Sequence, residues 1–404
     1  MSDNVVIIGA GQAGAQVAIS LRTGGFTGPI TMIGDEGYVP YERPPLSKHY
    51  LAGDMDESRM LMRPPEYYAQ HTVDMRLNAT VTRIDRTGSA VELADGTRLP
   101  YRWLVLTTGG RVRRLTAPGA DLGGVYYLRT IADVAAYRER LTAGTRLVIV
   151  GGGYIGLEVA AVAQKKGCHV TVLEVLPMVL NRVVAPEMSK FYTDVHTAAG
   201  VDIRVNTGVT AFTGDKQVRE VRCGAEAIPA DMVIVGIGIV PNVELAADAG
   251  LKVDNGIVVD DLTRTEDPQI LSLGDCANFP SGLYGGRMRL ESVPNALGQG
   301  KAAASVILGK PVPFTEVPWF WSDQYDLKLQ MAGVSRPGDQ IVIRGDMAAR
   351  KFSACYLRDG VFVACQAVNM VRDFMQAKPL IASRWRPDPV KLADASVTLK
   401  DMAA

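Results

Sequence analysis

The sequence lacks an excess of either charge, a long apolar run and any closely spaced cysteine pair. Its 43 basic and 43 acidic residues cancel to a formal net charge of zero, which argues against bulk binding to nucleic acid or to an anionic membrane. No apolar run approaches the roughly 20 residues that a membrane-spanning helix needs. The five cysteines are scattered and odd in number, so we expect reduced thiols and neither a redox-active disulfide nor a zinc site.

The length and composition are typical of a globular protein with more than one domain. The 404 residues predict two to three domains, and the contents of 47% hydrophobic and 21% charged residues suit packed cores with an ordinary surface. A predicted strand begins close to the first residue, which leaves no room for a signal peptide. We therefore expect a cytoplasmic enzyme.

Two segments, residues 9–14 and 151–156, have the form Gly-x-Gly-x-x-Gly, and each stands between a short apolar strand and a predicted helix. In this motif the first glycine permits a tight turn, the second lets the backbone approach a pyrophosphate, and the third lets helix and strand pack closely. The N–H groups and the positive end of the helix supply the anion site. One such motif is a weak signal, but two in this context predict two bound dinucleotides, a layout for passing electrons between them.

A carboxylate stands at the end of the next predicted strand in both modules, Asp35 in the first and Glu174 in the second. A carboxylate at this position bonds ribose hydroxyls, although either residue alone could be a solvated loop carboxylate. Glu174 would repel the 2′-phosphate of NADPH, so the sequence predicts a preference for NADH.

The two motifs head modules with the same order of elements, each closed by an apolar strand, at 103–106 and at 232–235. This repetition predicts a duplicated Rossmann-type unit with buried parallel strands. Later in the chain a predicted strand at 270–273 leads to Gly274 and Asp275. Together with Thr107-Thr108-Gly109 and the first fingerprint, this second flavin-type motif favours FAD in the first module.

The predicted fold class is therefore α/β, with two Rossmann-type dinucleotide-binding domains and a small C-terminal α+β domain. We expect an FAD-binding domain in two parts, 1–110 and 241–317, an NADH-binding domain at 111–240, and the C-terminal domain at 318–404. The predicted helices lie near 13–21, 156–166, 295–308 and 371–377.

Several segments resemble the FAD-dependent pyridine-nucleotide reductases with a glutathione-reductase-type fold and, more narrowly, the putidaredoxin reductase family of NADH-dependent ferredoxin reductases that serve bacterial oxygenases. The resemblance spans nearly the whole chain. Its motifs lie at 40–48 (PYERPPLSK), 127–130 (YLRT), 151–158 (GGGYIGLE), 291–296 (ESVPNA) and 319–325 (WFWSDQY).

The resemblance implies which residues contact each cofactor. The implied FAD contacts are Gly9, Gly11, Ala13, Asp35, Lys48, Val81, Arg129, Asp275 and Val293, and the segment with Trp321 is implied to shield the isoalloxazine. The implied NADH contacts are Gly151, Gly152, Gly153, Tyr154, Ile155, Gly156, Glu158 and Glu174, with Glu291 near the nicotinamide. Gly14, Arg43 and Gly238 are further candidate cofactor-binding residues. The chain departs from the family at Thr108, Gly298 and Gly300, and each of the two helix glycines costs roughly 1 kcal/mol relative to alanine.

Lys48 and Glu158 are the candidate catalytic residues. Lys48 follows the rigid Pro44-Pro45 turn, and its charge could stabilise reduced flavin, paired with Glu158. The ordinary alternatives are a surface lysine and a first-turn carboxylate that favours the helix dipole. Trp321 has a similar alternative, as a core anchor.

The segment after the second strand of the first module, residues 38–51, contains no cysteine, which argues against disulfide reductase and thiol peroxidase chemistry. The sequence therefore predicts an FAD-dependent NADH:ferredoxin oxidoreductase whose partner is an acidic 2Fe-2S ferredoxin and which is a monomer or weak homodimer. Arg63, Lys301 and Lys328 are candidate docking residues, with solvated surface charge as the alternative. An NADH oxidase and a redox-responsive binding protein are the rival functions.

Overall fold

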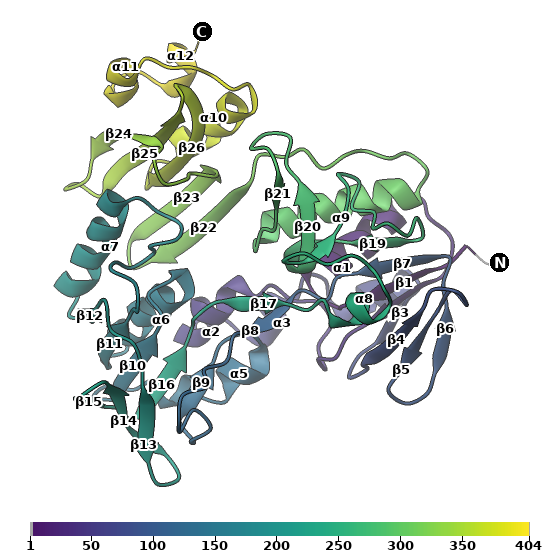
Figure 1. Cartoon of the computed structure of the whole chain (residues 1–404), viewed down its shortest axis with the longest axis horizontal. Helices are drawn as coiled ribbons and strands as arrows, with labels where there is room; N and C mark the ends of the chain where they lie inside the picture. The colour runs from purple at the N-terminus through teal and green to yellow at the C-terminus, as the bar shows by residue number, and fades with distance from the viewer. Residues whose placement is uncertain (1–2, 404) are drawn as a thin grey trace. The chain divides into compact units, whose positions relative to one another are not determined.

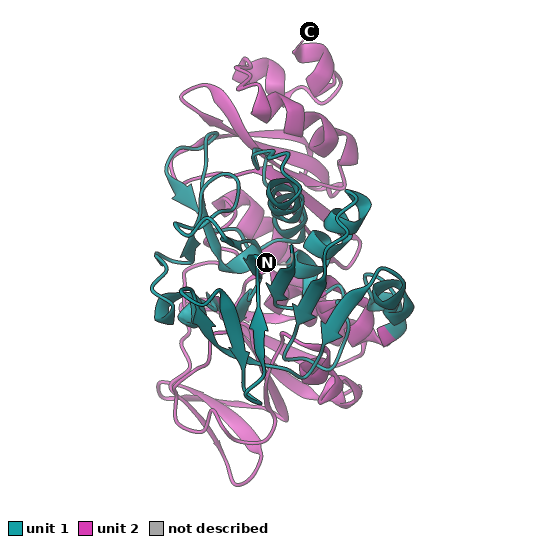
Figure 2. Cartoon of the chain, turned by 90° about the vertical axis from the view of Figure 1, so that its right-hand side faces the viewer, with its two compact units in different colours: residues 1–42, 58–111, 240–318 teal, residues 43–57, 112–239, 319–404 magenta. Residues whose placement is uncertain are grey.

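The structure is a computed structural model that describes residues 3–403 (Figure 1). The chain divides into two compact units, and each is built from several stretches of sequence (Figure 2). Unit 1 comprises residues 1–42, 58–111 and 240–318, and unit 2 comprises residues 43–57, 112–239 and 319–404. The short strands β8 (Gly110–Val112) and β17 (Ile239–Pro241) lie where the chain passes from one unit to the other.

Unit 1 is centred on a five-stranded parallel sheet with the strand order β19-β7-β1-β2-β3. Its central strand β1 is buried along its whole length, as the apolar run in the sequence predicts for a parallel strand covered on both faces. The strands are β1 (Val5–Ile8), β2 (Ile30–Ile33), β3 (Val73–Arg76), β7 (Trp103–Leu106) and β19 (Ile270–Ser272).

Helices α1 (Gln12–Thr23) and α9 (Val293–Ile307) pack against each other in the core of unit 1. The two glycines that depart from the family pattern make room for neighbours of α9: Gly300 for α1 and Gly298 for Phe314. A Cβ on Gly300 would lie 2.8 Å from Cβ of Gln16 on α1, and one on Gly298 would lie 2.5 Å from Cε2 of Phe314. The glycines therefore serve close packing in unit 1, which offsets their lower helix propensity.

Smaller elements complete unit 1. They include two three-stranded sheets, with the strand orders β4-β5-β6 and β18-β20-β21. The strands are β4 (Val81–Asp85), β5 (Ala90–Leu93), β6 (Arg98–Pro100), β18 (Ile257–Val258), β20 (Ala277–Pro280) and β21 (Arg287–Met288), and the helices are α4 (Pro65–Gln70), α8 (Glu244–Asp248) and the 3-10 turn η3 (Gly274–Cys276). Helix α3 (Glu57–Met60) begins at Glu57, the last residue of the stretch 43–57 of unit 2, and its other residues belong to unit 1.

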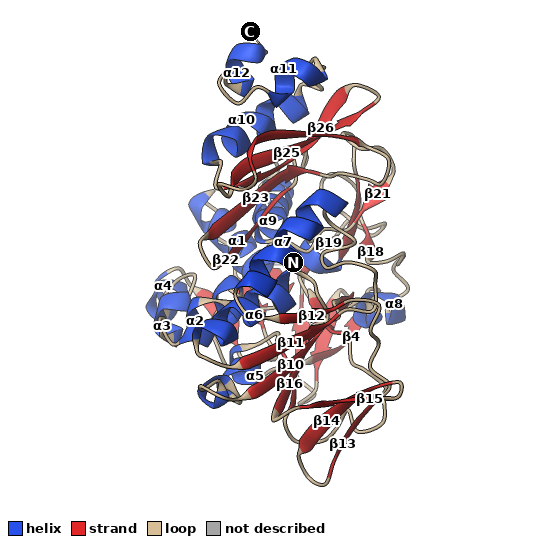
Figure 3. Ribbon diagram, turned by 90° about the vertical axis from the view of Figure 1, so that its left-hand side faces the viewer, coloured by secondary structure: helices blue, strands red, loops and turns tan. Residues whose placement is uncertain are grey.

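Unit 2 repeats the parallel scheme with the strand order β12-β11-β10-β16-β9, and Figure 3 shows these strands in red. The strands are β9 (Val125–Tyr127), β10 (Arg146–Val150), β11 (His169–Leu173), β12 (Asp202–Arg204) and β16 (Met232–Val235). The other elements of this part are η1 (Pro44–Ser47), α2 (His49–Ala52), α5 (Ile131–Ala135), η2 (Arg138–Arg140), α6 (Tyr154–Lys165), α7 (Pro186–Ala198) and the antiparallel strands β13 (Ala211–Gly214), β14 (Val218–Cys223) and β15 (Glu226–Pro229).

The C-terminal part of unit 2 is an antiparallel sheet with the order β22-β23-β26-β25-β24, and α10 (Val371–Ala382) packs against it (Figure 3). Its strands are β22 (Trp319–Gln324), β23 (Leu327–Gly333), β24 (Gln340–Asp346), β25 (Lys351–Arg358) and β26 (Val361–Val368), followed by α11 (Pro389–Ala393) and α12 (Leu399–Met402). The fully buried Arg344 pairs with the fully buried Asp373 at 2.9 Å and donates to the main-chain carbonyls of Leu392, Asp394 and Val397. One buried guanidinium thereby holds the C-terminal segment on the sheet.

The four predicted helices are present as α1, α6, α9 and α10, with ends shifted by a few residues. Helix α7 was not predicted. Its buried face is formed by Met188, Ser189, Phe191, Tyr192, Val195 and His196, and the apolar members stand at the spacing i, i+3, i+4 and i+7 of an amphipathic helix, a signal that the prediction missed.

Candidate functional site

The first glycine fingerprint has the shape that a pyrophosphate needs. Gly9 has φ +113°, and a Cβ there would lie 2.2 Å from the carbonyl oxygen of Thr107. A Cβ on Gly14 would lie 2.2 Å from the carbonyl oxygen of Gly9, whereas around Gly11 no described atom comes within 4 Å of such a Cβ. Gly11 is the N-cap residue of α1, and among the described residues no side chain makes a capping hydrogen bond to the start of this helix. The first turn of α1, including Ala13, therefore presents its N–H groups beside open backbone, which fits a dinucleotide phosphate.

The second fingerprint repeats this geometry in unit 2. Gly151 has φ +110°, and a Cβ there would lie 2.4 Å from the carbonyl oxygen of Gly236. A Cβ on Gly156 would lie 2.1 Å from the carbonyl oxygen of Gly151, and the space at Gly153 is open within the described part of the chain. Helix α6 begins directly after Gly153. Each unit thus contains one backbone cradle that fits a dinucleotide, and the tight contacts explain why only glycine suits the first and third positions.

Glu174 lies at the end of β11 beside the second fingerprint. Its carboxylate accepts hydrogen bonds from the backbone amides of Gly152 at 2.8 Å and of Leu176 at 2.9 Å. These two bonds fix a negative charge next to the cradle of unit 2. In unit 1 the corresponding Asp35 is exposed just after β2, and the next carboxylate, Glu36, accepts a hydrogen bond from the hydroxyl of Tyr41 at 2.6 Å.

Asp275 lies in η3, and two residues that sequence reasoning missed hold its surroundings. The guanidinium of Arg289 donates to the main-chain carbonyl of Asp275 at 3.0 Å and pairs with the carboxylate of Glu291 at 2.8 Å. The side chain of Gln299, fully buried on α9, accepts from the amide of Gly274 at 2.8 Å. Arg289 therefore brings Asp275 and Glu291 together within unit 1. Its position two residues before the Glu291 motif is the only sequence signal for it.

Lys48 and Glu158 form the pair that the sequence suggested. Lys48 Nζ lies 2.8 Å from Glu158 Oε2, and the two side chains are 12% and 1% exposed. Glu158 also accepts hydrogen bonds from Ser47 Oγ at 2.5 Å and from Ser322 Oγ at 2.6 Å. A buried carboxylate needs such partners, because its desolvation is otherwise costly. Neither serine was a predicted site residue, although both stand inside the motifs at 40–48 and 319–325.

Tyr154, the first residue of α6, packs against the C-terminal part of unit 2. Its hydroxyl donates to Met331 Sδ at 2.9 Å, and its ring lies 5.1 Å from the ring of Phe320. Burial raises the pKa of Tyr154 well above its usual value. Trp321, on the same strand as Phe320, is half-buried and stacks beside Trp319 with ring centroids 5.6 Å apart.

The structure also places the remaining predicted residues. In unit 2, Arg43 Nη1 donates to the carbonyl of Arg129 at 2.6 Å, Ile155 is 41% exposed, and Gly238 has φ +96° in the segment between β16 and β17. In unit 1, Val81 begins β4 and Val293 begins α9. The candidate docking residues Arg63, Lys301 and Lys328 are all exposed.

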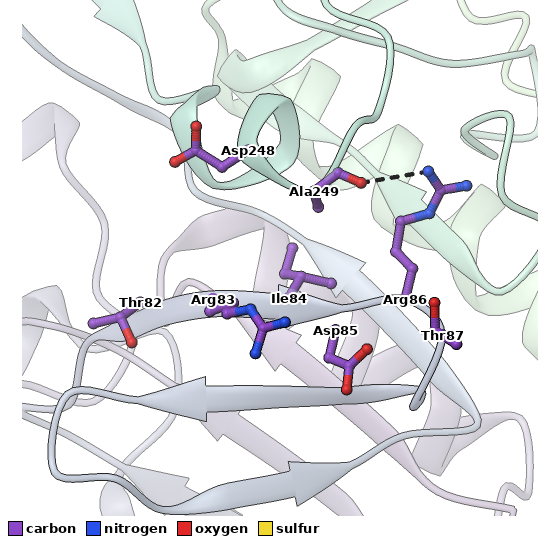
Figure 4. A pocket seen from close by; sticks show the side chains of 8 residues that line it. All are labelled: Thr82, Arg83, Ile84, Asp85, Arg86, Thr87, Asp248 and Ala249. Atoms are coloured by element: carbon purple, nitrogen blue, oxygen red, sulfur yellow. Dashed lines mark hydrogen bonds between the residues drawn. The ribbon is translucent and has the colours of Figure 1, made fainter.

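A polar hollow of about 250 Å³ in unit 1 does not coincide with the predicted site (Figure 4). It is lined by residues 82–87 together with Asp248 and Ala249. The charged groups in it have structural partners, because Arg86 pairs with Asp267 at 2.9 Å and Asp85 pairs with Arg98 at 2.5 Å. We assign it no function.

Within residues 3–403, no group of three or more His, Cys, Asp or Glu side chains is placed to hold a metal ion. No helix in the same range is both long and apolar enough to cross a membrane.

Comparison with known proteins identifies the relatives of this chain. The family model for pyridine nucleotide-disulphide oxidoreductases matches residues 3–300, and the model for the reductase C-terminal domain matches residues 319–403. Putidaredoxin reductase from Pseudomonas putida is 45% identical over 410 aligned residues, which cover 100% of this chain and 97% of that protein. Rhodocoxin reductase from Rhodococcus erythropolis is 44% identical, with 98% and 93% covered.

Solved structures agree with these relatives. The covalent putidaredoxin reductase–putidaredoxin complex contains a chain that matches with a TM-score of 0.97 and 45% identity, covering 99% of this chain and 98% of that chain. A ferredoxin reductase from Rhodopseudomonas palustris matches with a TM-score of 0.97 and 41% identity over 100% of both chains. The predicted fold class, the two cofactors and the family resemblance are confirmed. The chain belongs to the pyridine nucleotide-disulphide oxidoreductases and, within them, to the putidaredoxin reductase-like ferredoxin reductases, which are flavoprotein oxidoreductases that use FAD and NADH.

Proposed function

We propose that this enzyme passes electrons from NADH through FAD to a 2Fe-2S ferredoxin that supplies a bacterial monooxygenase or dioxygenase. The observation that carries the proposal is the presence of one open glycine cradle in each unit of a chain that is 45% identical to a ferredoxin reductase. FAD supplies the conversion between a two-electron donor and a one-electron acceptor. The protein's task is to bind and align the two nucleotides and to exclude competing reactions.

The proposed contacts follow the predicted residues. For FAD they are Gly9, Gly11, Ala13, Gly14, Asp35, Arg43, Lys48, Val81, Arg129, Asp275, Val293 and Trp321. For NADH they are residues 151–156, Glu158, Glu174, Gly238 and Glu291. Lys48 and Glu158 are proposed to act as a pair, in which Glu158 fixes the position of the ammonium group and Lys48 offers its positive charge to reduced flavin. Four contacts support a fixed placement of this pair. They are the ion pair itself, the contact of Lys48 Nζ with the carbonyl oxygen of Pro44, and the hydrogen bonds that Ser47 and Ser322 donate to Glu158.

A spectroscopic assay tests the proposal. Purified protein reconstituted with FAD should lose its yellow absorbance under anaerobic NADH, and an added 2Fe-2S ferredoxin should then be reduced in many turnovers. A protein that stays colourless after reconstitution, or a flavin that NADH does not bleach, contradicts the proposal. Rapid NADH consumption without any ferredoxin would favour an oxidase, and NADH-dependent oligomerisation without ferredoxin reduction would favour a redox-responsive binding protein.

Docking of the ferredoxin is proposed to use the exposed cations Arg63, Lys301 and Lys328, because ferredoxins are commonly acidic. Reversal of one of these charges should lower ferredoxin turnover, and the loss should shrink as salt rises, while flavin reduction by NADH is unchanged. The matched control is Lys216→Glu, which makes the same charge change at an exposed turn of unit 2. Equal ferredoxin kinetics for the docking and control variants would contradict these sites.

Gel filtration tests the proposed monomer or weak homodimer, and cell fractionation tests the proposed cytoplasmic location.

A further inference from the structure

His196 is a fully buried histidine on α7 that the proposed function does not use. It belongs to a continuous series of hydrogen bonds within unit 2 that ends at Glu158. We propose that His196, Gln324 and Tyr325 are positioning residues for the Lys48–Glu158 pair and that they act through Ser322. This inference rests on the proposed function, because that function gives the Lys48–Glu158 pair its role toward the flavin.

The series joins five side chains by four hydrogen bonds, from the turn after β22 through α7 and β22 to α6. Tyr325 OH lies 3.1 Å from His196 Nδ1, and His196 Nε2 lies 2.8 Å from Gln324 Oε1. Gln324 Nε2 then donates to Ser322 Oγ at 3.1 Å, and Ser322 Oγ donates to Glu158 Oε1 at 2.6 Å. His196, Gln324, Ser322 and Glu158 are each at most 1% exposed, so water does not compete for these bonds.

The carboxylate at one end fixes the direction of every bond. The carboxylate of Glu158 has only acceptors. The hydroxyl of Ser322 must therefore donate its one hydrogen bond to Glu158 and accept one from the amide of Gln324. The amide oxygen of Gln324 then faces His196, which must therefore carry its proton on Nε2. The remaining ring nitrogen, Nδ1, accepts from the hydroxyl of Tyr325. All donors in the series thus point toward Glu158, and a different histidine tautomer would break it.

The backbone at Tyr325 is strained in a way that serves this arrangement. Tyr325 has φ +56°, in the left-handed region, although it is an aromatic residue in the turn between β22 and β23. Such a conformation is unfavourable for a bulky side chain and persists where the surroundings impose it. Here it brings the Tyr325 ring edge-on to the imidazole, with ring centroids 5.0 Å apart. A glycine or asparagine would relieve the strain but would remove the hydroxyl.

The environment keeps the imidazole neutral. The pKa of His196 is lowered because burial disfavours the charged ring, and the hydrogen bond with Gln324 opposes this only in part. A neutral ring has one donor and one acceptor nitrogen, which matches its two partners. Without the Nε2 donor, the side chain of Gln324 can rotate, and Ser322 then loses the hydrogen bond that orients its hydroxyl. As a consequence, the Glu158 carboxylate, which holds Lys48, is less well placed.

The kinetic test uses FAD-loaded holoenzyme and stopped-flow reduction by NADH. His196→Phe should lower the rate constant for flavin reduction at saturating NADH by about tenfold, the effect expected when a buried bond is lost and a reacting group is misplaced. The dissociation constant for NADH should change by less than about threefold, because most of the proposed NADH contacts (residues 151–156, Glu174 and Gly238) lie outside the series. Tyr325→Phe removes only the first donor and should cost about threefold.

A double-mutant cycle separates a positioning role from a general structural role. If His196 acts through Ser322, then His196→Phe should change the rate by less than about twofold in a Ser322→Ala background. A full tenfold effect in that background overturns the proposal. The conservative variant His196→Gln should keep most of the wild-type rate constant for flavin reduction, unlike His196→Phe, because the glutamine amide also supplies a donor and an acceptor. Tyr192→Phe is the matched control, since it lies one turn earlier on α7 and its buried hydroxyl has no hydrogen-bond partner among the described residues. The control should retain the wild-type rate.

A second readout does not depend on turnover. The chain has four histidines, so 15N-histidine labelling gives a spectrum in which loss of one signal set in His196→Gln assigns His196. The wild-type ring should be the neutral Nε2–H tautomer, and its shifts should change in Ser322→Ala. An Nδ1–H tautomer, or shifts that ignore Ser322→Ala, overturns the proposal. A wild-type flavin that NADH fails to bleach instead overturns the proposed function, so the two failures are distinguishable.

Discussion

The side-chain oxygen of Gln299 accepts a hydrogen bond from the backbone amide of Gly274 at 2.8 Å, and this bond ties α9 to the turn that carries Asp275. Gly274 has φ +81°, a left-handed conformation that glycine adopts without a steric penalty. Within unit 1 the same turn is held from the other side by Arg289 at the carbonyl of Asp275. The proposed FAD contact of Asp275 therefore depends on two side chains that do not themselves belong to the predicted contact set.

Replacement of Gln299 tests this dependence. We expect Gln299→Met to keep the apolar volume of the side chain and to leave the Gly274 amide unpaired, which should raise the dissociation constant for FAD by about tenfold. Flavin release measured by fluorescence checks the expectation. The control is Gln340→Met at an exposed position of β24. Equal FAD retention in both variants would mean that the turn is held without Gln299.

The second and third glycines of the first fingerprint should fail in different ways when changed to alanine. Gly11→Ala places a methyl group in space that the protein leaves open, so the apoprotein should unfold at an unchanged temperature while FAD binds more than about tenfold more weakly. Gly14→Ala collides with the carbonyl of Gly9 and should lower the free energy of unfolding of the apoprotein by roughly 1–3 kcal/mol. Thermal unfolding and FAD titration separate the two effects. Weaker folding of Gly11→Ala would contradict an open cradle.

Glu174 should set the choice between NADH and NADPH. Its carboxylate is fixed by two backbone amides, so a 2′-phosphate beside it would meet a like charge that cannot swing away. We expect kcat/KM for NADH to exceed that for NADPH by about a hundredfold, and Glu174→Ala to reduce this ratio by at least about tenfold. Asp215→Ala, at an exposed turn, is the control. Equal kcat/KM for the two nucleotides in the wild type would show that the assignment is wrong.

Removal of one partner of the buried Arg344–Asp373 pair should strongly destabilise the C-terminal part of unit 2. Arg344→Met leaves an uncompensated carboxylate at Asp373 and should lower the free energy of unfolding by about 3–5 kcal/mol. The exposed pair of Arg350 with Asp326 is the comparison, and Arg350→Met should cost less than about 1 kcal/mol. Denaturant unfolding followed by tryptophan fluorescence measures both. Equal unfolding free energies for the two variants would contradict the expected cost of an unpaired buried carboxylate.

The parts of the site that could be predicted are those written in local sequence. The glycine fingerprints, the carboxylates after the second strands and the four amphipathic helices depend on a few neighbouring residues, and the structure places all of them as the patterns indicate. The closeness of Lys48 to Glu158 was suggested by family resemblance rather than by spacing. It depends on η1 and α6 coming together in unit 2, which no local pattern encodes.

Other parts could not be predicted because they join distant residues. The bond between His196 and Gln324 spans 128 positions, and no local pattern in the sequence encodes a contact of that separation. In the sequence, Gly298 and Gly300 are departures from the family pattern with a cost in helix propensity. Their meaning became clear only when Phe314 and Gln16 were seen to occupy the space that a larger residue would need.

The way in which unit 1 is assembled from three separate stretches has a consequence for biosynthesis. Its sheet pairs β7 with β19, and α9 comes later still in the chain. The ribosome must therefore synthesise the whole stretch 112–239 before β19 is available to pair with β7 in unit 1. Nascent chains should hold an open edge at β7 in the meantime, so the first nucleotide cradle to be synthesised should be the last to mature.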